Sequence, residues 1–198
     1  KSRNNAIRNN LHDAVRGANR LLFADGTFAE FTSDSDGWVS AFNSDGFSAT
    51  AGSGGLNNLN ANGYTYVAWN WKANGSGSTN TAGSITSTVS ANTTAGFSIV
   101  TYTGTGANAT VGHGLGVAPS MIIVKGRFAS NWSVYHASIT NATTSILILN
   151  STGAVVGSLP TYWNSTAPTS TVFSLGSDSN VNSTNSAGLV AYCFAAVA

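Results

Sequence analysis

The chain has 198 residues, of which eight are Lys or Arg and seven are Asp or Glu, and its formal net charge is +1. Because so neutral a chain has no positive footprint for phosphates, its composition argues against binding to DNA, RNA or an anionic membrane surface. Hydrophobic residues make up 42% of the sequence, enough for the core of one large β domain or two small ones, and no apolar run is long enough to insert into a membrane.

Residues 1–73 are predicted to form the first of two β units. Within it, residues 7–23 have apolar residues at helical spacing, but the matching segment later in the chain is typical of strands, so strands are expected here as well. A strand is also expected at 64–72, where the two-residue alternation places Trp69 and Trp71 on one face, which we expect to lie in the core.

Residues 74–95 are rich in Gly, Ser, Thr and Asn, a composition that predicts a linker or a long surface loop and hence the domain boundary. Residues 96–198 are predicted to form a second, complete β-sandwich unit. Its strands are short runs of β-branched and aromatic residues between turn residues. They are expected at 98–102, 121–124, 132–135, 146–149, 171–173 and 189–192.

The two units are predicted to be copies of one another. The motif Lys-Ser-Arg at 1–3 recurs as Lys-Gly-Arg at 125–127, an offset of 124 residues, and the segment 66–73 aligns with 189–196 at an offset of 123. The predicted fold class is therefore all-β, with two tandem, internally duplicated antiparallel β-sandwich units of jelly-roll type.

The second copy is preceded by an apolar, turn-rich segment, 96–124, that the first copy lacks. We expect either that the chain is a piece of a longer polypeptide or that a neighbouring subunit supplies the missing lead-in strands by edge addition, and we favour the first alternative. Ten of the fifteen charges lie within residues 1–36, so most of the remaining sequence is uncharged. Such stretches suit a surface that is packed in an assembly or solvated by hydroxyls and amides.

Few residues predict catalysis or metal binding. His12 and Asp13 are adjacent, but neighbours on a strand point to opposite faces, so a structural role is favoured over a catalytic one. His113 lies in a turn-forming context and is expected to be a loop histidine rather than a ligand. The sequences Asp-Ser-Asp-Gly at 34–37 and Asn-Ser-Asp-Gly at 43–46 alternate oxygen ligands as calcium loops do, but they lack a closing glutamate and are ordinary turn sequences. We predict no catalytic residues, no metal site and no cofactor.

Exposed aromatic rings among neutral amides and hydroxyls are typical of surfaces that bind glycans. Trp132 alternates with apolar residues and is assigned to the core. Trp38 and Trp163 are flanked by turn residues and occupy matching positions in the two units, so they are the candidates for contact with a glycan or receptor. Cys193, the single cysteine, excludes an internal disulfide and is predicted to be an inert packing residue.

Several stretches resemble repeated domains in tail-fibre-like virion proteins of marine bacteriophages. The resemblance covers most of the chain and is most specific around 96–125. It implies a β-rich virion appendage whose relatives carry several tandem copies, and it brings no catalytic residues to transfer. The stretches that carry it are 66–73, 96–106, 113–119, 121–125, 164–168 and 172–176, together with Phe-Asn-Ser-Asp-Gly-Phe at 42–47; the Asn-rich stretch 56–62 departs from the family's pattern.

We therefore expect a non-enzymatic virion structural protein, a tail-fibre or appendage domain that acts as a rigid spacer or as a host-surface binding module. A homo-oligomer is expected in the virion or outside the cell, with a trimer implied by the resemblance and a host-surface glycan as the candidate ligand. The alternatives are a capsid decoration or self-assembling extracellular filament subunit, a cellular adhesin, and a surface-glycan depolymerase, which would need two facing carboxylates.

Overall fold

The computed structural model describes residues 1–32, 35, 37–52 and 59–196, and it is nearly all β, as predicted. All the ladders between its strands are antiparallel. In chain order the strands are β1 (Asn10–Asp13), β2 (Gly17–Phe23), β3 (Phe31–Thr32), β4 (Gly37–Phe42), β5 (Phe47–Ala51), β6 (Ser78–Asn80), β7 (Ser87–Asn92), β8 (Phe97–Tyr102), β9 (Ala109–Gly112), β10 (Met121–Gly126), β11 (Trp132–His136), β12 (Leu147–Ile148), β13 (Val172–Leu175) and β14 (Leu189–Phe194). The helices are single turns: η1 (Ala142–Thr144), α1 (Pro160–Trp163) and α2 (Ser179–Asn182).

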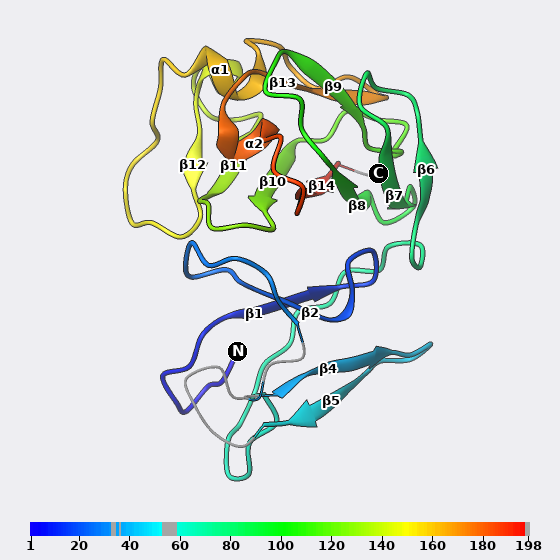
Figure 1. Ribbon diagram of the computed structural model, residues 1–198, viewed down its shortest axis with the longest axis vertical. Helices are drawn as coiled ribbons and strands as arrows, with labels where there is room; N and C mark the ends of the chain where they lie inside the picture. Colours follow the sequence, from blue (N-terminus) through cyan, green and yellow to red (C-terminus); the bar gives the residue numbers. More distant parts are fainter. Residues whose placement is uncertain (33–34, 36, 53–58, 197–198) are drawn as a thin grey trace.

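The largest sheet has seven strands in the order β12-β11-β10-β14-β8-β7-β6 and forms the middle of the upper body in Figure 1. β14 lies at its centre and is apolar on both faces, because both faces of the sheet are covered. Ala191 and Cys193 pack into the core on one face, whereas Val190 and Tyr192 pack on the other. We use the name sandwich body for this sheet together with β9, β13, α1 and α2, which pack on one of its faces.

The first face of the seven-stranded sheet is covered by the two-stranded sheet β9-β13 and by the short helices α1 and α2 (Figure 1). Val111 from β9 and Phe173 from β13 contribute to the larger hydrophobic core, as do Tyr162 from α1 and Val181 from α2. This arrangement resembles a β-sandwich in which part of the second layer is helical.

The second face of the sheet is covered by the β1–β2 hairpin, which Figure 1 shows directly beneath it. Leu22 of β2 packs there among buried residues of the sheet, including Trp132 and Tyr192. The burial of Trp132 confirms its assignment to the core, and β1 and β2 confirm the strands expected within 7–23. The β4–β5 hairpin lies farther from the sandwich body.

The segment 74–95 is not the linker that its composition predicts. It carries β6 and β7, which extend the seven-stranded sheet beyond β8. In β7 the apolar Val89 and the small Ser87 point into the core, while Thr88 lies on the opposite face. The backbone N–H and C=O groups of β7 are hydrogen-bonded to β6 and β8, so this strand needs few apolar side chains. Its polar composition is therefore compatible with a strand and does not indicate a loop. The sandwich body therefore begins well before residue 96.

The strand predicted at 64–72 is present only as an isolated antiparallel bridge between Tyr66 and Ser2. Trp69 and Trp71 are 66% and 59% exposed, so their assignment to the core is wrong. Alternation places side chains on one face of an extended chain, but burial also requires a covering layer. The described residues leave most of both rings uncovered, although Trp71 touches Phe97 and Phe194 at one edge. The proposed tandem duplication stays a prediction, because the described part of 1–73 forms the three-stranded sheet β1-β2-β3 and the β4–β5 hairpin rather than a second complete sandwich. Nowhere in the described ranges is a helix long and apolar enough to cross a membrane.

Candidate functional site

The two tryptophans predicted to contact a glycan or receptor lie in different surroundings. Trp163 ends α1 and is only 2% exposed, with its indole N–H donating to the Ser145 carbonyl at 3.1 Å and its ring edge-on to Tyr135. It therefore offers no open ring face to a ligand, which corrects the prediction for this residue. Trp38 lies on β4 opposite Thr50 and is half-buried, and its role in binding stays a prediction.

His12 and Asp13 do not form a catalytic pair. The Nδ1 atom of His12 lies 3.0 Å from the Ala18 carbonyl, which can only accept a hydrogen bond, so this nitrogen carries the proton. Burial lowers the pKa of His12 to about 4 and keeps the ring neutral near pH 7. The carboxylate of Asp13 points instead toward Arg16 and Tyr192.

A buried charged network fastens the β1–β2 hairpin to the sandwich body, and we call it the charged joint: Asp13, Arg16, Glu30, Arg127 and Tyr192. Arg16 binds Asp13 through Nε and Glu30 through Nη1, the latter at 2.9 Å, and the three side chains are at most 5% exposed. From the sandwich body, Arg127 binds both oxygens of Glu30 at 2.7 and 3.0 Å. Tyr192 of β14 donates its hydroxyl to Asp13 at 2.6 Å.

The electrostatics of the charged joint favour its ionised form. Burial alone would raise the pKa of Glu30, but hydrogen bonds from Arg127 and Arg16 outweigh that effect and hold the pKa below its usual value. Burial raises the pKa of Tyr192 well above its usual value, so its phenol stays protonated and able to donate. A buried carboxylate–guanidinium network with several hydrogen bonds fixes geometry even where its net contribution to stability is small.

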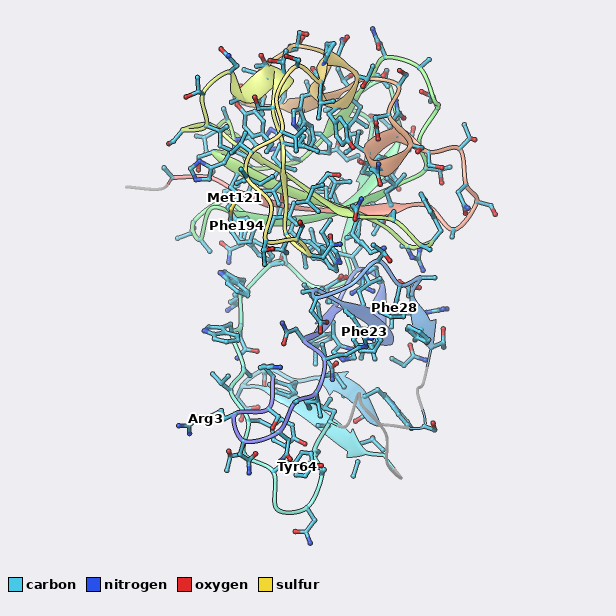
Figure 2. All side chains as sticks on the ribbon, turned by 90° about the vertical axis from the view of Figure 1, so that its left-hand side faces the viewer. Arg3, Phe23, Phe28, Tyr64, Met121 and Phe194 are labelled. Atoms are coloured by element: carbon cyan, nitrogen blue, oxygen red, sulfur yellow. The ribbon has the colours of Figure 1, made fainter. Side chains whose placement is uncertain are left out.

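Neutral contacts reinforce the charged joint. The indole N–H of Trp132 donates to the carbonyls of Phe23 and Gly26 at 2.9 and 3.1 Å, in the turn that follows β2. Backbone bonds join the same regions, from Glu30 N–H to the Arg127 carbonyl at 3.0 Å and from Ser130 N–H to Thr27 at 2.9 Å. Figure 2 shows Phe23, with Phe28 nearby, just beneath the sandwich body.

Lys125 is fully buried on the hairpin side of β10. Its ammonium donates to the carbonyls of Gly126 and Phe128 at 2.6 and 2.9 Å and to the Ser130 hydroxyl at 3.2 Å, and no carboxylate binds it among the described residues. Burial, helped by the nearby positive charge of Arg16, lowers the pKa of Lys125 to about 8. The sequence does not indicate this burial, because a lysine near the end of an apolar strand is normally able to reach solvent.

His113 and Cys193 are structural, as the sequence indicates. The Nδ1 atom of His113 accepts from the Leu115 N–H at 3.2 Å, so the other ring nitrogen carries the proton and donates to the Thr169 carbonyl at 3.1 Å. Burial lowers the pKa of His113 and keeps it neutral. Burial also raises the pKa of the Cys193 thiol to about 12, which keeps it unreactive.

The segment 43–46 forms the turn of the β4–β5 hairpin, where Asn43 N–H donates to the Gly46 carbonyl at 2.8 Å. Of the other predicted calcium-like sequence, Asp34 and Asp36 lie outside the described residues. Within the part of the chain that the structure describes, no three His, Cys, Asp or Glu side chains gather as metal ligands would.

A hydroxyl-lined groove of about 290 Å³ lies where β8 ends and β14 begins, and we call it the threonine groove. Thr79, Thr88 and Thr101 are register partners across β6, β7 and β8, so their side chains form a row at the strand spacing of about 4.8 Å. Among the described residues that line the groove, Arg127 alone is charged, and Glu30 already binds it.

A glycine brings the strands together at the threonine groove. Gly188 immediately precedes β14 and has a φ of +76°, and a Cβ atom there would lie 2.9 Å from the Tyr102 carbonyl oxygen. Lined by methyls and hydroxyls with almost no free charge, the groove suits a neutral, polyhydroxylated ligand better than a phosphate or a cation. Sequence reasoning missed this groove, because its threonines come from the segment predicted as a linker and from β8.

These features define an all-β module with a buried charged joint and a neutral groove. Residues 1–198, the whole chain, match the family described as Domain of unknown function (DUF7483), and the chain belongs to that family. No curated protein and no solved structure matches the chain significantly. The family description names no activity or ligand, so the chemistry of the surface and of the charged joint must indicate the function.

Proposed function

We propose that the chain is a non-enzymatic structural module of a virion appendage of the tail-fibre type, in which it acts as a rigid spacer. The observation that carries this proposal is the charged joint. A spacer must transmit position and force between successive modules, and a free linker cannot do so. Here Glu30, on the N-terminal side, accepts from Arg16 of the hairpin and from Arg127 of the sandwich body within one buried network.

The distribution of charge supports a role outside the cell. Asp13, Arg16, Glu30 and Arg127 pair with one another in the charged joint, and the long uncharged stretches of the chain leave hydroxyls and amides to solvate much of the remaining surface. Exposed ion pairs are screened by salt within a few ångströms at high ionic strength, whereas buried pairs and neutral hydrogen bonds are not. Such a module would keep its geometry in seawater or any other saline medium.

Binding to a host surface is the second candidate role, and the threonine groove favours it. A neutral host glycan is the expected ligand. Replacing Thr88 and Thr101 by Val would remove two hydroxyls at nearly constant volume and is expected to abolish binding on an array of neutral glycans. The control is Thr152→Val, at an exposed loop position. Equal binding by both variants would exclude the groove as the glycan site.

The described carboxylates favour the spacer over a depolymerase. Asp13 and Glu30 are buried in ion pairs, Asp25 lies beside Arg8, and Asp178 accepts from Asn180 N–H at the start of α2. The remaining described carboxylate, Asp45, is exposed in the β4–β5 turn. A retaining or inverting glycosidase needs two carboxyl groups that face a shared cleft. The test is incubation with envelope polysaccharide from the host, with reducing ends as the readout; no release is expected, and steady release would overturn the non-enzymatic role.

Immunogold electron microscopy with antibodies against the chain tests the appendage role. Gold on thin fibres that project from particles is the expected result. Gold spread over particle heads would favour capsid decoration, and gold on cell envelopes without particles would favour an adhesin. Light scattering with intact mass spectrometry on the native assembly then gives the subunit mass and number, for which a small closed homo-oligomer is expected. Large open assemblies would favour a filament.

A further inference from the structure

The segment that leads into the sandwich body is paired at its start and unpaired afterwards. Val67 N–H donates to the Lys1 carbonyl at 3.0 Å, and the Lys1 α-ammonium donates back to the Val67 carbonyl at 3.1 Å. From 68 to 73 the backbone makes no hydrogen bond with any described residue. The next bond runs from Asn74 N–H to the Ser90 hydroxyl at 2.8 Å. Over this stretch the chain runs without a turn toward the sandwich body (Figure 1).

The paired start has the same register as the start of β14 against β10. Arg3 N–H donates to the Thr65 carbonyl at 2.8 Å, and Arg127 N–H donates to the Gly188 carbonyl at 2.9 Å. The two donors are 124 residues apart in the sequence and the two acceptors are 123 apart, which are the offsets of the sequence repeat.

The next pair follows the same rule. Lys1 lies opposite Val67, as Lys125 lies opposite Val190, again at offsets of 124 and 123 residues. Residues 66–71 therefore take the place of β14 beside a strand equivalent to the end of β10.

Residues 68–71 differ from β14 in lacking neighbouring strands. β14 is paired along its length with β10 on one side and β8 on the other, whereas residues 68–71 have neither neighbour among the described residues. Trp69 and Trp71 correspond to Tyr192 and Phe194 of β14. Tyr192 is 5% exposed, but Trp69 and Trp71 are 66% and 59% exposed. An apolar face and an open backbone edge thus coincide in one segment, a combination that favours pairing with another strand.

We propose that residues 68–73 are an acceptor site for an added antiparallel β-strand with the chemistry of β8, supplied by another polypeptide segment. The geometry of β14 indicates which backbone groups the added strand would use. Ala195 N–H donates to the Gly96 carbonyl, so every second amide before it in β14, including that of Cys193, faces β8. The counterpart of Cys193 is Asn70, whose amide would face the added strand.

The same register specifies the side chains of the partner. β8 places Phe97 opposite Phe194 and Ile99 opposite Tyr192. The added strand should therefore be uncharged, with an aromatic residue opposite Trp71 and a β-branched residue opposite Trp69. The ring centroids of Trp71 and Phe194 are already 6.0 Å apart. Figure 2 shows Phe194 beside Met121 at the lower edge of the sandwich body. The acceptor would exist whether or not the chain belongs to a virion.

The experiment adds a synthetic peptide with the sequence of residues 96–104 to the full chain. Saturable binding is expected, with a blue shift of tryptophan emission as Trp69 and Trp71 leave water. Hydrogen exchange should slow at the amides of 68–73, and a scrambled peptide should do neither. No protection of these amides at a peptide concentration that saturates any fluorescence change would overturn the proposal.

A pair of variants tests the backbone bonds directly. Asn70→Pro removes the amide that the added strand needs and keeps the preceding residue extended, so binding should weaken roughly tenfold or more. Asn70→Ala removes the same side chain but keeps the amide, and it should bind as the unaltered chain does. Equal loss in both variants would overturn strand addition. Self-association of the chain that Asn70→Pro abolishes, without peptide binding, would overturn the β8-like partner in favour of a second copy of this segment.

Discussion

At the residue scale, Lys125 is a buried ammonium whose hydrogen bonds all go to neutral oxygens. Its pKa is about 8 in the folded chain, against 10.5 for an ordinary lysine, so the unfolded chain binds this proton more tightly. Raising the pH through this window therefore favours the folded chain. We expect urea unfolding to show a gain on the order of 1 kcal/mol from about pH 7.5 to about pH 9.

Two variants test whether the gain in stability between about pH 7.5 and about pH 9 comes from Lys125. Lys125→Met should flatten the rise, since it removes the titrating amine and keeps most of the buried stem. The control is Lys72→Met, which removes an exposed lysine and should keep the rise. A rise that survives in Lys125→Met would mean that another group titrates in this window.

The lowered pKa of His12 predicts that the stability of the folded chain falls on the acidic side of the pH range. Burial lowers its pKa from 6.5 to about 4, so the unfolded chain takes up a proton first as the pH falls. Stability should therefore decline from pH 6.5 toward pH 4, as measured by urea midpoints at fixed temperature. His12→Asn keeps a donor for the Ala18 carbonyl and should make the decline shallower. The control is His136→Asn on β11, and a decline that is equally steep in both variants would contradict the role of His12.

At the element scale, the β1–β2 hairpin depends on Arg16, which joins Asp13 to Glu30. Arg16→Met leaves two buried carboxylates short of a partner and is expected to destabilise the chain by about 3–5 kcal/mol in urea unfolding. Adding Asp13→Asn to that variant should recover part of the loss, because it removes one stranded charge. The control is Arg20→Met: Arg20 is 39% exposed and 3.6 Å from Glu30, and its loss should cost less than about 1 kcal/mol. Equal costs for the two arginines would show that the joint does not hold the hairpin.

The strands that the sequence predicts correctly are those with a dense apolar pattern between turn residues, such as β10 and β14. β6 and β7 could not be found this way, because a strand inside a sheet can be built from Ser and Thr when its neighbours supply the apolar contacts. Trp69 and Trp71 show the opposite case. They alternate as the side chains of a buried strand do, but they stay exposed because no second layer covers them. Trp163 is buried although turn residues follow it, because it is the last residue of α1, a single-turn helix whose second half packs into the core.

The candidate site was still harder to predict. Arg127 and Glu30 are 97 residues apart, and nothing local to either of them indicates the bond between them. Asp13 and Arg16 are close in sequence, and the Asx turn in which Asp13 accepts from the amides of Val15 and Arg16 is the one local signal of the joint. Long-range ion pairs of this kind depend on the packing of the hairpin against the sheet, which composition and periodicity do not contain.

At the scale of the whole molecule, the placement of charge predicts an unusual tolerance to salt. Among the described residues, Arg8 and Asp25 form the one ion pair in which both side chains are about a third exposed, and their closest atoms are 3.8 Å apart. Such a pair contributes at most about 1 kcal/mol, whereas the pairs that Arg16 makes with Asp13 and Glu30 are shielded from counterions by burial. Moving from about 0.05 M to about 1 M NaCl should therefore change the melting temperature by less than about 4 °C.

Calorimetry across that range of salt, on the intact chain and on Asp25→Asn, checks this prediction. The two proteins should respond alike, because the variant removes the exposed pair and leaves the joint intact. A fall of about 10 °C or more in the intact chain would mean that screened surface charges hold the hairpin on the sheet. It would count against a spacer built for saline surroundings, because the relative position of the two parts would then vary with ionic strength.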